Sequence, residues 1–540
     1  MTTSPHLSIV AFRAILVALA LACCVGPGSA SAADDEMAGE FFQSGYPPTL
    51  SIHLADGAAD RLRENPRGSV PCTLTVDGDT THEDVAIRLK GAAGSFQDLD
   101  GKPAFTLTMD RFRPGRRFHG LDKFHLNNSV QDASLLDEWL GGALFRAAGI
   151  PAARVTHARV ILDDRDLGMY VFKEALDHDF LKRHFDDSSG NLYDGGSGVD
   201  IDTLSERDVG KNGVPGADLK ALAAACRTED PDQRWAAIEE RLDVTEFITF
   251  MALELMTAHW DGYTTAHNNY RIYIDPGNGG RARFIPHGMD QILGDPQAPL
   301  LDLPPTLVAA AVMDNPAWRN AFREKVRELL PLFDADGRLL PLLEEQAGRL
   351  RPVVAESGEE ALAAWDEAVS DLRQRIAARE ENLREQASAP EPEPTHFDDA
   401  RRAVLAGWSP RVDDGTALVE EIDVEGDGRR LSIAVEGGEA AIASWRVAIE
   451  LPPGKYLFQG LAIQEGVDPL EDDPTSGAGL RISGGTRDER VDVEGEWTLL
   501  GHVFEVESTR TVELVAELRA RQGRVWFNAG SLCLLRLSAP

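Results

Sequence analysis

Cysteine is scarce in this 540-residue chain, which has five cysteines in all. Two of them, Cys23 and Cys24, lie in an apolar stretch near the N-terminus, and the rest of the chain has only Cys72, Cys226 and Cys533. Three cysteines so far apart form neither a disulfide framework nor the closely spaced ligand pairs of a zinc site. We therefore expect all three to be small buried apolar side chains.

Positive charge is also in short supply. The chain has 54 lysines and arginines against 89 aspartates and glutamates, which gives a formal net charge of −35. A surface this acidic repels the phosphate backbone of nucleic acids and the head groups of anionic lipids. The composition therefore excludes nucleic acid and bare membrane as partners, and it suits a soluble protein that attracts cations.

Long apolar runs are nearly absent, and the one that exists lies near the N-terminus. Ile15–Val25 follows the basic side chain of Arg13 and precedes the small residues Ala30–Ala32. This pattern predicts a signal peptide over residues 1–33, which is too short to remain as a membrane span. We expect an exported protein, periplasmic, cell-surface or extracellular, with no transmembrane span in its mature form. The stretch "ALACC" also resembles a lipobox, so lipid attachment at one of its two cysteines is a second option.

A change of pattern divides the rest of the chain. Residues 34–46 are acidic and are expected to lack regular structure, and residues 47–386 begin with strands and continue with long helices. The stretch "ASAPEPEPT" at 387–395 alternates proline with acidic and small residues, which is typical of a stiff linker. Residues 396–540 show short alternating runs separated by turn residues, which predicts a β-sandwich or jelly roll. The predicted fold class is therefore α+β.

Several elements of the first region can be predicted locally. Strands are expected at 85–91 and 102–110, a helix at 132–151 and a hairpin at 158–174. A buried helix should begin near Asp243, where Glu246 stands at capping-box spacing.

The stretch "HWDGYTTAHNNY" at 259–270 follows that buried helix, and two short strands joined by the turn "PGNGG" come next. Because a hairpin brings its own ends together, Asn269 at its entry and Asp290 just beyond its exit should become neighbours. Asp261, on the loop leading in, lies within reach of both. Two carboxylates and an amide make an oxygen-rich site that suits Mg²⁺ or Mn²⁺.

The order of these residues along the chain is that of a protein kinase active site. A carboxylate on a loop is followed by an amide, a hairpin and a metal-binding carboxylate, which is the set that phosphoryl transfer needs. The structural alternatives are simpler: Asp261 ends a helix, Asn269 satisfies backbone groups in a turn, and Asp290 caps a strand.

At this point the chain resembles the CotH spore-coat kinases, a family of atypical protein kinases of reduced size. The similarity runs from about residue 85 to 294 and more weakly through the helices to 386. The segments that carry it are "RLKGAAGSF", "KPAFTLTMD", "GLDKFHLNNSVQDASLL", "AAGIPAARV", "DLGMYVFKEALDHDFLKRHF", "GNLY", "HWDGYTTAHNNYRIY" and "FIPHGMDQILG".

The resemblance implies a reduced kinase-like domain with a C-terminal helical extension, which uses ATP and Mg²⁺ or Mn²⁺. It implies transfer of phosphate to Ser or Thr of a coat or cell-surface protein. By position, Asp261 resembles the catalytic-loop aspartate, and Asn269 and Asp290 resemble the two metal ligands. Lys102 resembles a basic residue in contact with phosphate, and Glu174 resembles an acidic residue near the adenine-binding hinge.

The chain departs from the family pattern in three places. His287 and Gly288 stand where many members have Trp-Asp, Asp137 stands where a basic residue is usual, and the loop after Asp261 is about two residues longer. The departure at His287 and Gly288, together with the appended C-terminal domain, favours an alternative function, a non-catalytic envelope or coat protein that uses the kinase-like fold as a scaffold. Its C-terminal region, with "SWRVAIELPPGKYLFQG" and "GLRISGG", is similar to jelly-roll carbohydrate-binding modules, which implies a glycan- or surface-binding domain.

Overall fold

The computed structural model describes residues 27–538 except for 93, 197, 301–305, 389–394, 425–427, 471–472, 474–475, 488–489 and 507–509. Most of the predicted signal peptide and most of the predicted linker therefore lie outside the described residues. In the part of the chain that is described, no helix is both long and apolar enough to span a membrane.

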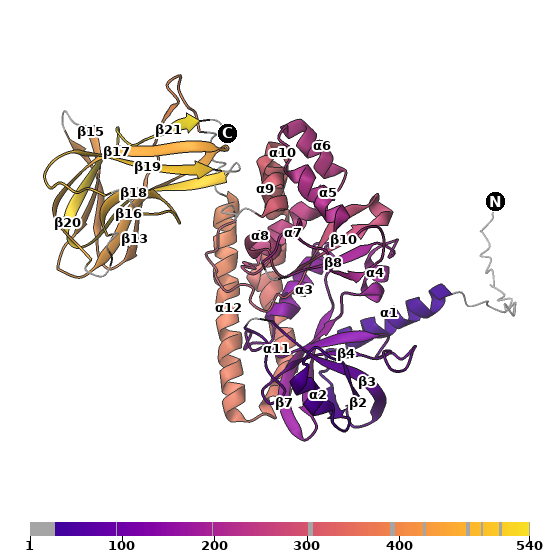
Figure 1. The fold of residues 1–540 in the computed structure, drawn as a ribbon. Helices are drawn as coiled ribbons and strands as arrows, with labels where there is room; N and C mark the ends of the chain where they lie inside the picture. Colours follow the sequence, from indigo (N-terminus) through magenta and orange to yellow (C-terminus); the bar gives the residue numbers. More distant parts are fainter. Residues whose placement is uncertain are drawn as a thin grey trace, which may run out of the picture.

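Seven strands near the N-terminus close into a barrel, which Figure 1 shows at the lower right. Their order is β1-β2-β3-β4-β5-β7-β6, and β1 pairs in parallel with β6 to close it. The strands are β1 (Thr49–Leu54), β2 (Val70–Val76), β3 (Thr80–Lys90), β4 (Ala104–Thr108), β5 (Lys123–Asn127), β6 (Val155–Leu162) and β7 (Arg165–Glu174). Alternate residues point inward, so Leu89, Phe105, Phe124 and Phe172 fill the barrel core, and the other face is free to carry polar groups.

Three helices border the barrel: α1 (Pro27–Gln43), α2 (Ala58–Glu64) and α4 (His178–His184). Residues 34–43 were expected to lack regular structure, and this prediction is wrong. The helix there is anchored by Phe41, whose ring meets the rings of Phe118 and Phe172 edge-on at 5.3 and 5.0 Å. Tertiary packing therefore outweighs the acidic composition of the segment.

Helix α3 (Asp137–Ala147) connects β5 to β6 and starts five residues later than predicted. Leu135 has a φ of +66°, and the Asp132 carboxylate accepts hydrogen bonds from the N–H groups of Ser134 and Asp137. This turn replaces the first helical turn, because a left-handed residue cannot continue a helix.

The region after the barrel is built on a four-stranded sheet of order β11-β10-β8-β9 covered by helices. Its strands are β8 (Asn191–Gly195), β9 (Arg207–Val209), β10 (Tyr270–Asp275) and β11 (Arg281–Pro286), with the 3₁₀ turn η1 (Pro276–Asn278). Its helices are α5 (Ala217–Cys226), α6 (Pro231–Glu239), α7 (Val244–Met256), α8 (Tyr263–Ala266), α9 (Leu307–Asp314) and α10 (Pro316–Leu329). Helix α7 is buried on every face from Phe247 onward, as its apolar sequence predicts.

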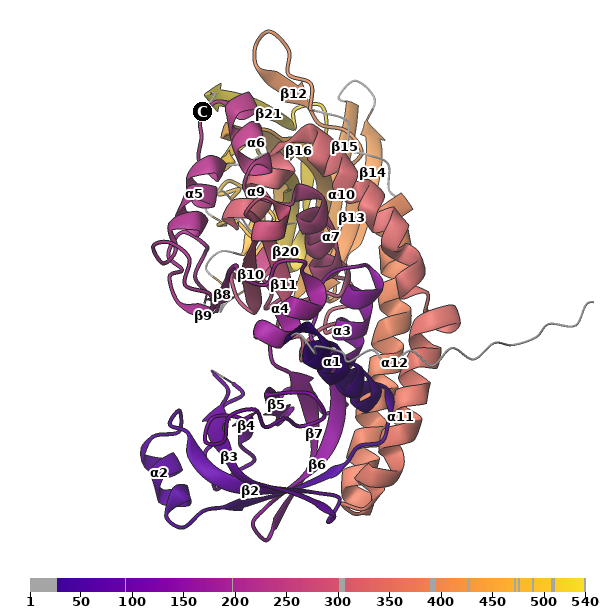
Figure 2. The ribbon, with the colours of Figure 1, turned by 90° about the vertical axis from the view of Figure 1, so that its right-hand side faces the viewer.

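Two long helices then run back along the barrel, as Figure 2 shows. They are α11 (Leu340–Ala355) and α12 (Glu359–Ser388), preceded by the short helices η2 (Leu330–Phe333) and η3 (Ala335–Leu339). Trp365 of α12 donates its indole N–H to the carbonyl of Ser134, and Gln346 of α11 is hydrogen-bonded to His157 of β6. The helical extension therefore holds the barrel and the helical region together.

The C-terminal strands form a sandwich around an apolar core of their own. They are β12 (Arg402–Val404), β13 (Ser409–Asp414), β14 (Leu418–Val424), β15 (Gly428–Val435), β16 (Ala441–Leu451), β17 (Gly454–Pro469), β18 (Gly477–Ile482), β19 (Thr498–Val506), β20 (Arg510–Asn528) and β21 (Cys533–Ser538). Glu450 of this sandwich pairs with Arg319 of α10 at 3.1 Å. The predicted α+β class with a C-terminal sandwich is confirmed. Cys72, Cys226 and Cys533 are buried and unpaired with one another, as expected.

Candidate functional site

Asp261 lies on the loop that joins α7 to α8, and two amides hold its carboxylate. Oδ1 accepts a hydrogen bond from Nδ2 of Asn268 at 2.9 Å, and Oδ2 accepts one from Nδ2 of Asn269 at 2.8 Å. The side chain is half-buried. The carboxylate is therefore fixed in direction and still open on one side, as a group that orients a hydroxyl must be.

A second carboxylate, Glu254 of α7, holds the end of this loop at the point where α8 begins. Its Oε1 accepts the N–H of Tyr263 at 3.0 Å, and its Oε2 accepts the N–H and the hydroxyl of Thr264 at 2.8 and 2.5 Å. Glu254 is fully buried, so these three donors replace the water it has lost. The residue directly before Tyr263 must be glycine, because a Cβ on Gly262 would lie 2.5 Å from Oε1 of Glu254.

The hairpin of β10 and β11 brings Asn269 to the turn that carries Asp290. Tyr270 is paired with Pro286, and the N–H of His287 donates to the carbonyl of Asn269 at 3.0 Å. The amide of Asn269 lies against Gly288, where a Cβ would be only 2.4 Å from Oδ1. The departure from the family pattern at position 288 therefore makes room for the Asn269 side chain.

Asp290 is half-buried, and burial raises its pKa above the ordinary value. The charge of Glu138 raises the pKa further, whereas Lys173 and Lys90 lower it. The Asp290 carboxylate therefore interacts electrostatically with one anion, Glu138, and with two cations, Lys173 and Lys90.

The oxygen ligands at this site fit a divalent cation that is bound by phosphate oxygens as well as by the protein. Asn269 offers an amide oxygen and Asp290 a carboxylate, with the Asp261 carboxylate beside the amide, and Mg²⁺ commonly takes one or two carboxylates together with substrate phosphates. Among the described residues, no three or more His, Cys, Asp or Glu side chains are gathered so that they could hold a metal by themselves. A site with few protein oxygen ligands suits a metal whose other positions are taken by the phosphates of a nucleotide.

Lys102 and Glu174, the two predicted nucleotide contacts, have protein partners. Nζ of Lys102 donates to the carbonyl of Met169 at 3.0 Å and lies 5.0 Å from the ring centre of Tyr170. Burial lowers the pKa of Lys102 to about 8. No contact here is with Asp261, Asn269 or Asp290.

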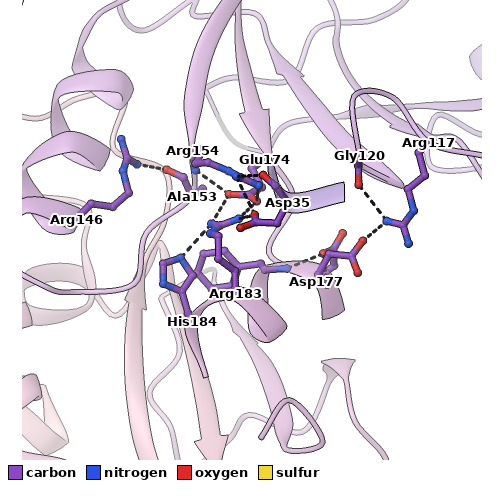
Figure 3. Close-up of polar contacts among 12 residues, drawn as sticks. Asp35, Arg117, Gly120, Arg146, Ala153, Arg154, Glu174, Asp177, Arg183 and His184 are labelled. Carbon is purple, nitrogen blue, oxygen red and sulfur yellow. Dashed lines mark hydrogen bonds and ion pairs between the residues drawn. The ribbon is translucent and has the colours of Figure 1, made fainter. Parts of the chain in front are cut away.

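Figure 3 shows Glu174 between two arginines. Its Oε1 pairs with Arg154 at 2.8 Å, and its Oε2 accepts from the backbone N–H of Arg154 at 2.9 Å and from Arg183 at 2.7 Å. Burial opposes the charged form of Glu174, but the arginines outweigh it and lower its pKa. Both predicted roles stay predictions, and these contacts give Glu174 a structural task as well.

Sequence reasoning missed a polar cluster on the outer face of the barrel next to Asp290. Lys173 of β7 pairs with Glu138 of α3, their Nζ and Oε1 being 2.5 Å apart, and each side chain is only 1 % exposed. Nζ of Lys173 is also 3.2 Å from Nδ1 of His287. A lysine directly after the apolar run "GMYVF" was the one sequence signal available, because lysine is almost never fully buried unless it is paired.

A cavity of about 310 Å³ lies beside this site and is acidic. Its lining includes Asp132, Asp137, Trp260, Gln291, Asp371 and Arg375. Arg375 is already engaged, because it pairs with Asp371 at 2.8 Å and donates to the carbonyl of Ile292 at 3.2 Å. Asp137 is buried, and its Oδ1 has no hydrogen-bond partner among the described residues.

Asp137→Asn is expected to stabilise the protein at neutral pH by about 1–3 kcal/mol, the usual cost of a buried unsatisfied polar group. Burial, followed by the charges of Asp132, Asp290 and Asp371, raises the pKa of Asp137 well above its ordinary value, and only Arg375 opposes them. The folded state therefore favours the protonated acid, so this group's stabilising contribution is present at low pH and is lost as the pH rises through its folded-state pKa.

Urea unfolding between about pH 4 and about pH 8 measures this effect, because that range starts near the unfolded-state pKa of aspartate. The wild-type protein should lose stability relative to Asp137→Asn as the pH rises. Glu367→Gln, an exposed carboxylate of α12 whose charge does not act on Asp137, is the control and should follow the wild type. Parallel curves for Asp137→Asn and the wild type would contradict the assignment.

Comparison with known proteins places this site inside a family match. The family model described as CotH kinase protein matches residues 87–383. Invasin CotH2 of Rhizopus delemar is 25% identical over 277 residues, which cover 47% of this chain and 46% of that protein. Inner spore coat protein H of Bacillus subtilis is 22% identical over 266 residues, which cover 45% of this chain and 72% of that protein. The chain spans about half the length of the invasins it matches.

One solved structure similar to part of this chain is TmCBM61 in complex with β-1,4-galactotriose. It is 10% identical, covers 25% of this chain and 90% of its own, and has a TM-score of 0.15. The family match, in contrast, begins in β3 and ends in α12, so it includes every residue described above from Lys90 to Asp371.

Proposed function

The chain belongs to the CotH kinase protein family, and from this we propose that it is an exported protein kinase. It would transfer the γ-phosphate of ATP to Ser or Thr hydroxyls of a coat or cell-surface protein, with Mg²⁺ or Mn²⁺. The names of its relatives, invasins and spore coat proteins, support a substrate at a surface or coat.

One observation carries the proposal: the contact between Asp261 and Asn269 at the turn that leads to Asp290. Two amides from the residues that lead into β10 hold the Asp261 carboxylate, and the Asn269 side chain fits because residue 288 is glycine. Such bonds stabilise any loop, but phosphoryl transfer also uses this set, with one carboxylate for the hydroxyl and an amide with a second carboxylate for the phosphates.

The chain's own groups would act as follows. Asp261 orients the acceptor hydroxyl and takes its proton, while the hydroxyl oxygen bonds to the γ-phosphorus. The bond from that phosphorus to the β–γ bridging oxygen breaks, and ADP leaves with the electron pair. Asn269 and Asp290 would hold the divalent cation, which supplies neutralisation of the phosphate oxygens when it is bound.

Transfer of labelled phosphate from ATP with Mg²⁺ or Mn²⁺, by protein that starts at about Asp34, tests the function. Autophosphorylation and a Ser/Thr-rich acceptor are the readouts. Asp290→Asn should reduce transfer by at least about a hundredfold, the usual effect of removing one charge-stabilising group. Asp295→Asn is the matched control, because that side chain lies five residues on and only caps an exposed turn.

The contrary outcome is equally specific. Folded wild-type protein that neither transfers phosphate nor binds a nucleotide would contradict the proposal. It would leave the scaffold function, with the sandwich as the part that attaches to a surface or glycan.

A further inference from the structure

The cavity between α3 and α12 holds more negative than positive charge. Asp132, Asp137 and Asp371 line it, and Arg375 is the one cation among the described residues of its lining. Arg375 already pairs with Asp371 at 2.8 Å. The other two carboxylates are each only 4 % exposed, and the part of the chain that the structure describes places no cation within ion-pair distance of either. The cavity therefore has an uncompensated negative charge.

The two buried carboxylates differ in their hydrogen bonds. The Asp132 oxygens accept the N–H and the hydroxyl of Ser134 at 2.9 and 2.5 Å, and the N–H of Asp137 at 3.0 Å. Oδ1 of Asp137, in contrast, has no hydrogen-bond partner among the described residues. A buried carboxylate oxygen without a donor is costly. Asp137 is therefore the group in this cavity that lacks a partner.

A large aromatic side chain belongs to the same cavity. Trp260 lines it and is 56 % exposed. The face of an indole ring attracts a cation that lies within about 6 Å of the ring centre. A carboxylate that lacks a donor and an exposed indole are together the two groups that recognise an organic cation.

The size of the cavity and its ligands disfavour a bare metal ion. Its volume is about 310 Å³, which is room for about ten water molecules. Among the described residues, no three or more His, Cys, Asp or Glu side chains are gathered so that they could hold a metal. The hydrogen bonds of Asp132 also leave Asp137 as the main acceptor. A short chain with several N–H donors fits this volume, whereas a metal ion would lack ligands.

We propose that this cavity binds an organic cation, an ammonium or guanidinium group on a short chain, with Asp137 as its hydrogen-bond partner and the Trp260 ring beside it. The inference goes beyond the proposed function and does not depend on it, because no nucleotide takes part. Trp260 directly precedes Asp261 in the chain, so the ligand would lie next to the candidate active site.

The test uses agmatine, which has a guanidinium group at one end and an ammonium group at the other. Calorimetric titration at neutral pH and fixed ionic strength, without nucleotide or divalent metal, gives its Kd for protein that starts at about Asp34. Asp137→Asn should weaken binding by about tenfold or more, as expected for the loss of a hydrogen bond between charged groups. Trp260→Leu should weaken it about two- to fivefold. Glu367→Gln, an exposed carboxylate of α12, is the matched control and should bind agmatine as the wild type does.

Urea unfolding gives a second readout that does not depend on heats of binding. A ligand that binds only the folded state stabilises it. Saturating agmatine should therefore stabilise the wild type and leave Asp137→Asn almost unchanged. The stability advantage expected for Asp137→Asn in the free protein should then shrink.

A capped Gly-Arg-Gly peptide distinguishes the two sources of such a cation. Tighter binding of agmatine would identify a free amine as the ligand, and tighter binding of the peptide would identify an arginine side chain of a partner protein. Either result supports the site if Asp137→Asn weakens that binding.

Two outcomes would overturn the inference. Equal affinity of the wild type and Asp137→Asn would mean that agmatine is attracted only by the net charge of −35. Folded wild-type protein that binds neither agmatine nor the peptide would also overturn it. Neither outcome affects the proposed function, because phosphate transfer is measured separately and without these ligands.

Discussion

Arg379→Met should lower the free energy of unfolding of region 47–386 by about 3 kcal/mol or more, the usual cost of leaving several buried polar groups without their partner. Arg379 is an arginine of α12 that is only 1 % exposed. Its guanidinium donates to the carbonyls of Leu255 and Met256 at 2.7 and 3.0 Å. These two carbonyls lie at the C-terminal end of α7, and the last carbonyl groups of a helix have no hydrogen-bond partner within the helix.

The same guanidinium also fixes the segment after Asp290. It donates to the carbonyls of Pro296 and Ala298 at 3.2 and 2.6 Å, and to Oδ1 of Asn382 at 2.8 Å. Burial lowers the pKa of Arg379 to about 10, so the side chain is still charged at neutral pH, and each of its three nitrogens donates to at least one of these acceptors. The variant therefore frees one end of α7 and the segment beyond Asp290 at once.

Chemical unfolding followed by intrinsic tryptophan fluorescence measures the loss, and Trp260 and Trp365 lie in the affected region. Arg373→Met is the matched control from the same helix. Its ion pair with Glu344 is largely exposed, so it should cost no more than about 1 kcal/mol. Arg379→Lys should fall between the two, because an ammonium cannot reach five acceptors in one plane. An equal loss for Arg373→Met and Arg379→Met would contradict the capping role.

The elements that the sequence predicts well are those set by local signals. Asp243 is the N-cap of α7 and accepts the N–H of Glu246 at 3.1 Å, as the capping pattern indicates. The turn "PGNGG" joins β10 and β11 into the expected antiparallel hairpin, and the register of that hairpin brings Asn269 to the Asp290 turn. Short-range rules suffice for these features because all the groups involved lie within a few residues or within one hairpin.

The contacts that sequence reasoning missed join residues far apart in the chain. Glu138 and Lys173 are 35 residues apart, and Arg379 lies 123 residues from the Met256 carbonyl that it caps. A lysine in a strand and an arginine in an amphipathic helix both look like solvated side chains until the packing of the elements is known. The role of Glu254 was hidden for a different reason, since its donors are the N–H groups of Tyr263 and Thr264 at the start of the next helix, α8, rather than groups of its own helix.

Two contacts give a physical reason for the residues at positions 287 and 288, where the chain departs from the family pattern. His287 lies against Lys173, and Gly288 leaves the space that the Asn269 amide occupies. The histidine at position 287 therefore has a buried partner, because Nζ of Lys173 of β7 lies 3.2 Å from its Nδ1. Local compensation of this kind is consistent with a site that keeps its shape.

Glu254→Gln is expected to reduce phosphate transfer by about a hundredfold, because a small displacement of a catalytic group has an effect of that size. One amide NH₂ would then face the N–H of Tyr263 or the N–H of Thr264, both of which are donors. The loop would shift to relieve this conflict and would carry Asp261 with it. The buried mismatch should also cost about 1–3 kcal/mol of stability.

Glu246→Gln is the matched control for this variant. Glu246 lies in the first turn of the same helix and pairs with Arg283, so its loss destabilises α7 without touching the Asp261 loop. Its phosphate transfer should equal that of the wild type at a temperature where both are folded. Equal loss of transfer in the two variants would mean that stability, rather than the position of Asp261, limits activity.

A pH series separates the charge of Glu254 from its shape. Burial alone would lower the pKa of His259, but the Glu254 carboxylate, 3.7 Å from Nδ1, outweighs it and raises that pKa. His259 therefore contributes stability that is fully present below its unfolded-state pKa and is lost as the pH rises through the folded-state value.

In Glu254→Gln the charge that raises the pKa of His259 is gone, and burial should leave His259 neutral. Between about pH 5 and about pH 8, around the ordinary histidine pKa, the stability difference between wild type and variant should shrink as the pH rises. A difference that stays constant would show that Glu254 acts on the loop through its hydrogen bonds alone.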